Sequence, residues 1–281
     1  EESFAKLSDG VIDFMSQYTF SNFVLGMKTA GFISNKLINS QMTLDFAYTL
    51  YLLLNNDPTI ERSQIKHYVA KWFVMSTLTS RYIGSPESQM DFDIRRIREK
   101  GFMTFFKEVE EAELSDTFWN VGLVQNLETQ VINSPFFNVF LAAQIYEGNN
   151  ALFSNGTKVG YLITLMGDVH HIFPKQYLRK NGYDEKMLYN QIANFTYLDT
   201  QVNKGISDDA PNVYFKNAIE ACENGKTLYG NIADTATLRQ NLQENCIPES
   251  IVDMDYSNYP DFLASRRKLM AKKIQNYYKS L

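Results

Sequence analysis

Hydrophobic residues recur at helical spacing through the N-terminal part of the chain. The apolar run 42–54 predicts a helix, and the Asn-Asn-Asp-Pro sequence at 55–58 should end it. Within 65–76, residues such as Val69 and Trp72 form one apolar stripe, with lysines lying off it. Ser-Pro-Glu at 85–87 is typical of a helix start. The pattern predicts a helical N-terminal domain.

The helical pattern stops at two turn-rich segments, Gly-Asn-Asn at 148–150 and Ser-Asn-Gly at 154–156. Clusters of Gly, Asn and Ser between periodic segments indicate loops. The sequence therefore places a domain boundary here, with a helical domain over 1–150 and a second domain over 151–225. The remaining residues, 226–281, are expected to form a helical segment that packs on the second domain.

The second domain begins with a different pattern. Residues 159–166 are apolar, short and partly β-branched or aromatic, which predicts an extended segment. This strand should stop by Phe173, because Pro174 cannot donate a ladder hydrogen bond. Residues 195–198 predict a second short strand, and 203–205 predict a turn. Ser207 or Asp208 would then cap a helix through about residue 223, which completes a ββα unit and an α+β, mostly α fold.

Composition constrains the partners. The chain of 281 residues has a net charge of −5, which argues weakly against a broad nucleic-acid surface. A local basic patch is still expected from Lys175, Arg179, Lys180 and Lys204. No stretch of about 18 apolar residues is present, so no membrane span is expected. The two cysteines lack metal-site spacing and predict reduced thiols in a cytoplasmic protein.

Two of the three histidines, His170 and His171, are adjacent and follow Asp168. Histidine titrates near neutral pH and also binds metals. Neighbours in a strand point to opposite faces, so the two imidazoles can do different work if the strand ends or twists there. One could hold a cation while the other takes a proton from water.

Several spaced elements around this pair form a recognisable motif. They are His-His-Ile-Phe-Pro-Lys at 170–175, Ala-Asn-Phe-Thr-Tyr-Leu at 193–198, Asn-Lys at 203–204, Ser-Asp at 207–208, Ala-Pro at 210–211 and Tyr-Phe at 214–215. Asn203 follows Asn194 by nine residues. The stretch resembles the HNH, or ββα-metal, nuclease motif of RNA-guided CRISPR effectors. It is most similar to the C-terminal HNH region of GmrSD-type DNA restriction proteins. Residues 71–94 resemble, more weakly, the helical region that precedes the nuclease in these proteins, and residues 261–267 are also similar to that family.

The resemblance implies roles for individual residues. His171 would be the general base that activates water, and Asn194 would complete the catalytic motif by fixing its loop through hydrogen bonds. His170 and Asn203 would be the metal ligands. Each has a simpler alternative. His171 would be a structural histidine whose ring hydrogen bonds are made within the fold, and His170 would only form a hydrogen bond across the hairpin. Asn203 would be a turn residue with a left-handed backbone.

The metal set and the DNA contacts are expected as follows. The resemblance implies Mg or Mn. CRISPR-type nucleases carry Asp where this chain has His170, and the softer imidazole shifts preference toward Mn, Ni or Zn. Asp168 either adds outer-sphere charge to the metal or ends the strand. Lys175, Arg179 and Lys204 are candidate DNA contacts, and Lys204 is equally well explained as an exposed lysine.

The sequence thus predicts a metal-dependent DNA endonuclease with a DNA partner. By resemblance it would be the effector part of a restriction or anti-phage defence protein, preceded by a nucleotide-hydrolysing sensor region that these 281 residues do not include. A DNA- or protein-binding module with a degenerate, inactive HNH unit is the alternative.

Overall fold

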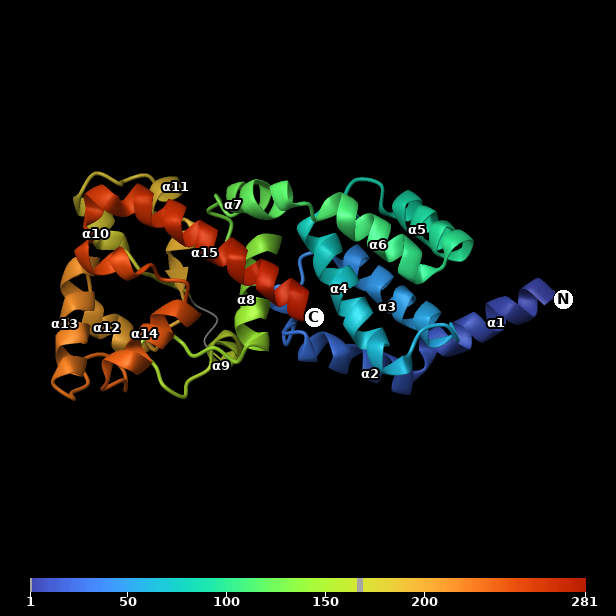
Figure 1. Ribbon diagram of the computed structural model, residues 1–281, viewed down its shortest axis with the longest axis horizontal. Helices are drawn as coiled ribbons and strands as arrows, with labels where there is room; N and C mark the ends of the chain where they lie inside the picture. The colour runs from blue at the N-terminus through green and yellow to red at the C-terminus, as the bar shows by residue number, and fades with distance from the viewer. Residues whose placement is uncertain (1, 166–168) are drawn as a thin grey trace. The chain divides into compact units, whose positions relative to one another are not determined.

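A computed structural model describes residues 2–165 and 169–281, and Asp168 lies outside these ranges. The chain divides into two compact units: residues 1–118 with 278–281, and residues 119–277. The described residues are mostly helical with two short strands, which confirms the expected mostly α class (Figure 1). None of the helices in the described ranges is long and apolar enough to cross a bilayer.

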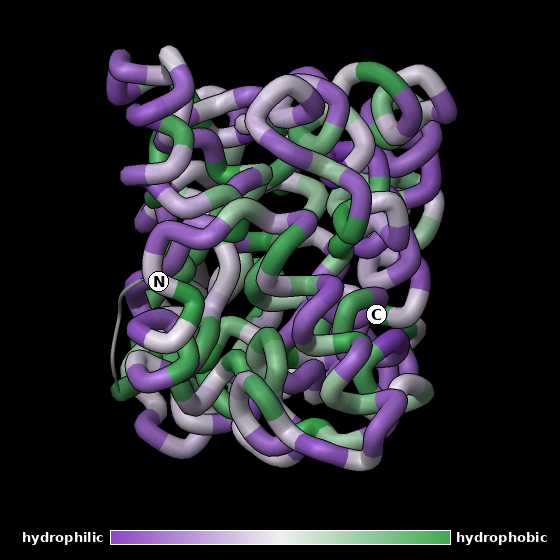
Figure 2. Tube along the Cα trace, turned by 90° about the vertical axis from the view of Figure 1, so that its left-hand side faces the viewer, coloured by the Kyte–Doolittle hydropathy of each residue, from purple (hydrophilic) through white to green (hydrophobic). Residues whose placement is uncertain are grey.

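The first unit is built from helices. They are α1 (Glu2–Met15), α2 (Gln17–Thr29), η1 (Asn35–Leu37), α3 (Gln41–Asn55), η2 (Arg62–Gln64), α4 (Ile65–Leu78), α5 (Pro86–Lys100) and α6 (Phe102–Glu113). Helix α3 covers the predicted 42–54 run, and Ser40 caps it by accepting a hydrogen bond from Thr43 N. Helix α5 begins at Pro86, as the Ser-Pro-Glu pattern predicted. Hydrophobic and hydrophilic stretches alternate along the trace (Figure 2), as amphipathic helices require.

The core of the first unit surrounds Trp72, which packs against Phe46, Phe102, Phe105 and Phe106. Aromatic rings of this kind dominate the apolar area that such a core buries. The sequence's helical stripe through 65–76 is therefore the buried face of α4.

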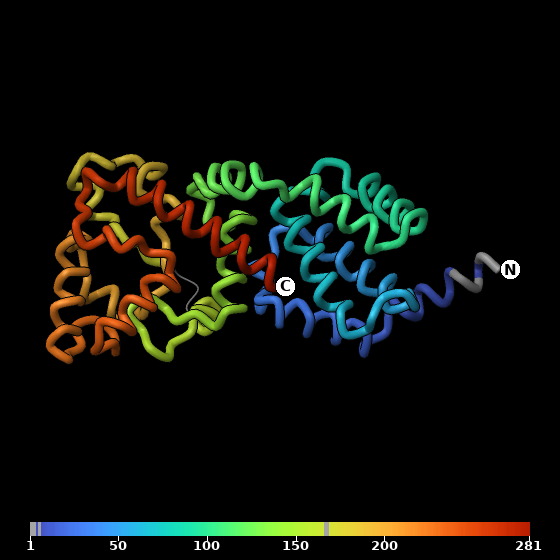
Figure 3. Tube along the Cα trace, in the orientation of Figure 1, coloured from blue at the N-terminus to red at the C-terminus, as the bar shows by residue number. Residues whose placement is uncertain are grey.

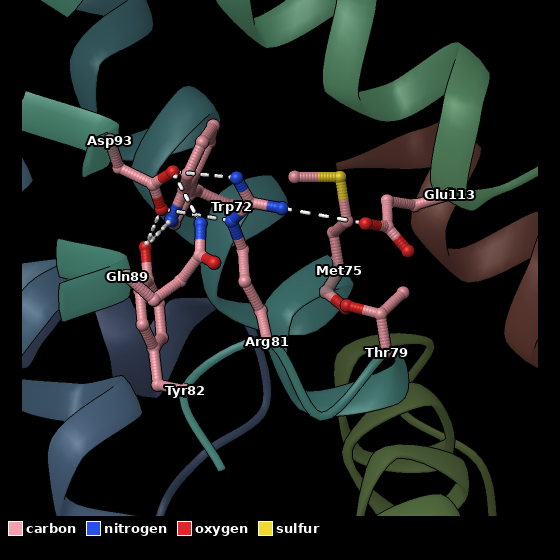
Figure 4. Close-up of polar contacts among 8 residues, drawn as sticks. All are labelled: Trp72, Met75, Thr79, Arg81, Tyr82, Gln89, Asp93 and Glu113. Carbon is pink, nitrogen blue, oxygen red and sulfur yellow. Dashed lines mark hydrogen bonds and ion pairs between the residues drawn. The ribbon is translucent and has the colours of Figure 1, made fainter. Parts of the chain in front are cut away.

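A buried carboxylate ties this core to α5. Asp93 is fully buried and accepts from Arg81 Nε and Nη2 at 2.9 and 2.6 Å (Figure 4). Tyr82 Oη and Gln89 Nε2 also donate to it, at 2.8 and 2.9 Å, and Trp72 Nε1 donates to Tyr82 Oη. A buried charge is stable only when it is paired and hydrogen-bonded. The Asp93 carboxylate accepts hydrogen bonds from three neighbouring side chains, so we interpret it as a structural link between these helices and not as a ligand site.

The second unit carries the motif. Its elements, with the π-helix that spans the division, are η3 (Phe118–Gly122), α7 (Leu123–Asn126), α8 (Pro135–Tyr146), α9 (Val159–Leu165), β1 (His170–His171), α10 (Lys175–Lys180), α11 (Lys186–Tyr189), η4 (Ile192–Asn194), β2 (Phe195–Thr196), α12 (Thr200–Ile206), α13 (Pro211–Glu223), α14 (Thr235–Glu244), η5 (Glu249–Asp253) and η6 (Tyr256–Asn258). The last helix, α15 (Tyr259–Ser280), begins in this unit. Figure 3 follows the path, with α15 in red beside the yellow segment of α10 and α11.

The two strands pair antiparallel, with His170 opposite Thr196 and His171 opposite Phe195. The first strand ends before Phe173, as the following Pro174 predicted. The second strand was expected over 195–198 and is shorter, ending at Thr196. The hairpin therefore places both histidines at the start of the motif's loop.

Three local predictions were wrong. Residues 159–165 are helical rather than extended: Val159, Leu162 and Ile163 are buried at helical spacing, and α9 packs on α8. Residues 203–205 belong to α12 rather than to a turn, because Asp199 caps that helix by accepting from Gln201 N at 2.7 Å.

The third wrong prediction concerns the start of the next helix. Helix α13 begins at Pro211, with Ala210 at its N-cap, and not at Ser207 or Asp208. Ser207 instead terminates α12 with a φ of 54°, a left-handed backbone that cannot begin a helix. Proline at the first helical position explains the later start.

The two units divide near residue 118, ahead of α8. Helix α8, which lies before residue 150, packs within the second unit against α9, and Phe137 contacts Phe195 of β2 with ring centroids 6.1 Å apart. Burial of the α8 face accounts for this grouping. The C-terminal elements pack on the same unit, with η5 against α13 and Phe262 of α15 against Phe173.

Candidate functional site

The hairpin is held by the side chain of Asn194, which is fully buried. Its Oδ1 accepts from Phe173 N at 2.8 Å, and its Nδ2 donates to Phe173 O at 3.1 Å and Tyr189 O at 3.3 Å. One amide thus satisfies three buried backbone groups that no regular ladder reaches. Asn194 therefore fixes the loop after His171, which is a structural contribution to the site.

A buried arginine forms hydrogen bonds to the backbone of the second strand and of the residues just before it. Arg266 of α15 donates through Nη1 to Ala193 O at 2.9 Å and Phe195 O at 2.6 Å, and through Nη2 to Asn245 O at 3.1 Å. Burial lowers the pKa of Arg266 to about 10, so the group stays cationic at neutral pH. Arg266 connects α15 to the strand that pairs with the two histidines.

A pocket of about 210 Å³ opens in front of the hairpin. It gathers polar side chains from four elements that are separate in sequence: β1, α10, α12 and α13. The lining residues are Val169, His170, His171, Pro174, Lys175, Gln176, Leu198, Asn203, Ile206, Ser207 and Tyr214. Four residues that the sequence proposed, His170, His171, Asn203 and Lys175, therefore share one cavity.

The environment of His171 keeps its imidazole neutral near pH 7. Burial lowers the pKa of His171 below the usual histidine value, and the hydrogen bond with Asn190 acts in the opposite direction. Positive charge on Lys175 and on His170 lowers that pKa further. Nε2 of His171 lies 3.2 Å from Asn190 Oδ1, and the ring of Phe195 meets the imidazole edge-on at 5.1 Å. A neutral, oriented imidazole meets the requirements for a base.

The proposed metal ligands offer two donors of different chemistry. His170 supplies an imidazole nitrogen, and Asn203, which lines the same pocket, supplies a hard, neutral amide oxygen. Across the described residues no group of three or more His, Cys, Asp or Glu gathers as a metal cluster. Two protein donors fit a cation that keeps several positions for water and phosphate, as Mg²⁺ usually does. Asp168, the third proposed ligand, lies outside the described residues.

The proposed DNA contacts divide into two groups. Lys175 lines the pocket, and its Nζ lies 5.3 Å from the centroid of the Tyr189 ring. Arg179 and Lys204 are exposed, and neither belongs to the described lining of the pocket. Lys180 forms an ion pair with Asp208, which lowers the pKa of that carboxyl.

The sequence motif included Tyr214 without giving it a role, and it did not lead to Asn190 or Arg266. Asn190 contacts His171, Arg266 braces β2, and Tyr214 lines the pocket while donating to Ile172 O at 2.7 Å. Arg266 left a sequence signal of its own, because it follows Phe262 and precedes Met270 by four residues and so occupies the apolar face of α15. Asn190 ends a four-residue helix and has no distinguishing sequence pattern.

Comparison with known proteins adds one distant relative. No family model matches the chain, and no solved structure matches it. An uncharacterized protein of Methanocaldococcus jannaschii is 29% identical over 165 residues, which are 56% of this chain and 26% of that protein. The chain thus spans about a quarter of the length of this curated relative.

Proposed function

We propose that the chain is a metal-dependent DNA endonuclease built on an HNH unit. The observation that carries the proposal is the shared pocket: His170, His171 and Asn203 come from a strand and a helix and meet in one cavity of about 210 Å³. A neutral imidazole beside two metal-type donors is the set that phosphodiester hydrolysis needs. The spacing of the sequence motif supports the same conclusion independently.

In this proposal His171 accepts a proton from the attacking water. His170 and Asn203 hold the cation, and Lys175, at the pocket's edge, contacts a phosphate oxygen. A bound divalent cation would stabilise the charge that develops on the phosphate and on the leaving oxygen. Asn194 and Arg266 would support the site indirectly, through hydrogen bonds to the backbone of the two strands and the loop between them.

The wider role follows from the resemblance to GmrSD-type restriction proteins. We place the nuclease in DNA restriction or anti-phage defence in the cytoplasm, as the effector part of a protein whose nucleotide-hydrolysing sensor region lies upstream. The match covers 26% of the relative from Methanocaldococcus jannaschii, so that protein carries further sequence outside the matched region.

Plasmid nicking tests the proposal directly. The purified chain should convert supercoiled plasmid to the open-circular form with Mg or Mn, and EDTA should stop the reaction. His171→Ala should lower the rate by about 10²–10⁴, the usual contribution of a general base. His67→Ala is the matched control, because His67 lies in α4 of the other unit. DNA binding without any cleavage by the wild type would favour a degenerate binding module instead.

A further inference from the structure

The contact between His171 and Asn190 specifies more than the position of the ring. Nε2 lies 3.2 Å from Oδ1 of Asn190, and an amide oxygen only accepts hydrogen bonds. With the Asn190 amide in this orientation, Nε2 carries the hydrogen, which leaves the lone pair of a neutral imidazole on Nδ1. We infer that Asn190 is a positioning residue that holds His171 in the Nε2–H tautomer, so that Nδ1 receives the proton from water; this inference rests on the proposed nuclease function.

Asn190 is itself held in place by its neighbours. Its backbone N–H donates to Lys186 O at 3.0 Å as the C-cap of α11. The preceding carbonyl, Tyr189 O, accepts from Asn194 Nδ2 at 3.3 Å and from Tyr259 Oη at 3.2 Å. Side chains from η4 and α15 thus fix the backbone immediately before Asn190. A catalytic group is oriented reliably only when its supporting residue is itself restrained in this way.

Aromatic packing restrains the imidazole plane as well. The Phe195 ring lies edge-on to it, with centroids 5.1 Å apart and an interplanar angle of 90°. The Tyr189 ring also packs near the imidazole, with centroids 6.2 Å apart and an interplanar angle of 55°. With the plane set by these rings and Nε2 set by Asn190, Nδ1 is the ring nitrogen left for chemistry. A base oriented by a third group is the arrangement that recurs in activated catalytic sites.

The amide has a specific consequence as the orienting group. When Nδ1 takes a proton, the hydrogen on Nε2 stays in place and continues to donate to Asn190 Oδ1. No proton moves to the amide, because Asn190 does not titrate. The ring and its partner therefore pass through the proton transfer without rearrangement.

Nitrogen NMR of ¹⁵N-histidine-labelled protein tests the tautomer without any activity measurement. The full chain has only three histidines, and the variants His67→Ala and His170→Ala assign the three ring systems. In metal-free buffer, at a pH above the pKa of the imidazole, the wild type should show His171 with its hydrogen on Nε2. A wild-type His171 with its hydrogen on Nδ1 would overturn the inference, whatever the variants do.

Two substitutions then separate orientation from packing. Asn190→Ala should give mixed tautomers at His171 and a nicking rate about 10–100-fold lower, the range typical for loss of an outer-sphere partner. The KM for plasmid should not change, because Asn190 does not touch DNA in this scheme. Asn190→Asp keeps an acceptor oxygen, so it should restore the Nε2–H tautomer and most of the rate.

Asn224→Ala is the matched control. Asn224 is also an asparagine that ends a helix, α13, and its amide makes one local bond to Glu220 O, yet it is exposed. Its loss should change neither the tautomer nor the rate. Unchanged tautomer and rate in Asn190→Ala would refute the role of Asn190, whereas absence of nicking in the wild type with the expected tautomer would refute only the nuclease proposal.

Discussion

At the scale of single residues, the identity of one metal ligand should set the metal preference. His170 presents an imidazole where CRISPR-type nucleases carry a carboxylate, so Mn or Ni should support nicking at least as well as Mg. His170→Asp should shift the preference toward Mg, because a carboxylate is a harder donor. Nicking rates across a series of Mg, Mn and Ni concentrations give the measurement. An unchanged metal profile in this variant would remove His170 from the coordination set.

The second residue-scale prediction concerns Asn194. Asn194→Ala removes the side chain that pairs with the buried groups Phe173 N and Phe173 O, whereas Tyr189 O keeps its hydrogen bond from Tyr259 Oη. Each unsatisfied buried group costs about 1–3 kcal/mol, so the two groups at Phe173 should lower the free energy of unfolding in urea by about 2 kcal/mol or more. Asn224→Ala, at an exposed helix end, should cost little. A loss below about 1 kcal/mol for Asn194→Ala would mean that the loop is held by other contacts.

At the scale of elements, α15 should stabilise the hairpin through one side chain. Arg266→Met fills similar space but removes three hydrogen bonds to Ala193, Phe195 and Asn245 carbonyls. Hydrogen bonds to charged groups contribute about 1.5–3 kcal/mol each, so the variant should unfold at clearly lower urea concentration. Arg267→Met is the control, since Arg267 makes one longer ion pair, at 3.5 Å, with the exposed Glu128. Equal midpoints for the two variants would contradict the role of Arg266.

The same scale shows where sequence reasoning stops. The end of the first strand before Pro174 and the start of a helix at Pro86 were predicted correctly, because proline acts through local covalent geometry. Residues 159–165 were assigned to the wrong element, because a short apolar run fits a buried strand or a buried helix equally well. Packing of α9 on α8 decides between them, and that contact is not local. The helical assignment of Asn203 depended likewise on recognising Asp199 as a cap.

For the candidate site, the motif spacing led to His170, His171, Asn203 and Lys175, which do share a pocket. It did not lead to Asn190 or Arg266, because their partners are backbone carbonyls or a ring that only folding brings near. Residues that belong to a chemical motif can therefore be predicted from the sequence. Residues that support the motif through buried contacts cannot, because those contacts form only in the folded chain.

At the scale of the whole molecule, charge should govern how the protein holds DNA. The net charge is −5, so binding should depend on the few cations near the pocket rather than on a broad basic surface. Lys175 lines the pocket, and Arg179 and Lys204 are exposed in the neighbouring helices α10 and α12. Lys180 should contribute less, because its ammonium group is paired with Asp208.

This charge distribution predicts a shallow salt dependence. Each phosphate neutralised on duplex DNA contributes about −0.9 to the slope of log binding constant against log salt concentration, so about two or three contacts give a slope near −2 to −3. Lys175→Ala should make the slope shallower by about 0.9, the value of one phosphate contact, and Lys180→Ala should leave the slope nearly unchanged. Fluorescence anisotropy with a labelled duplex, from low to physiological salt and without metal, measures both. A wild-type slope of −6 or steeper would mean that DNA contacts a much larger basic surface than these lysines and the arginine provide.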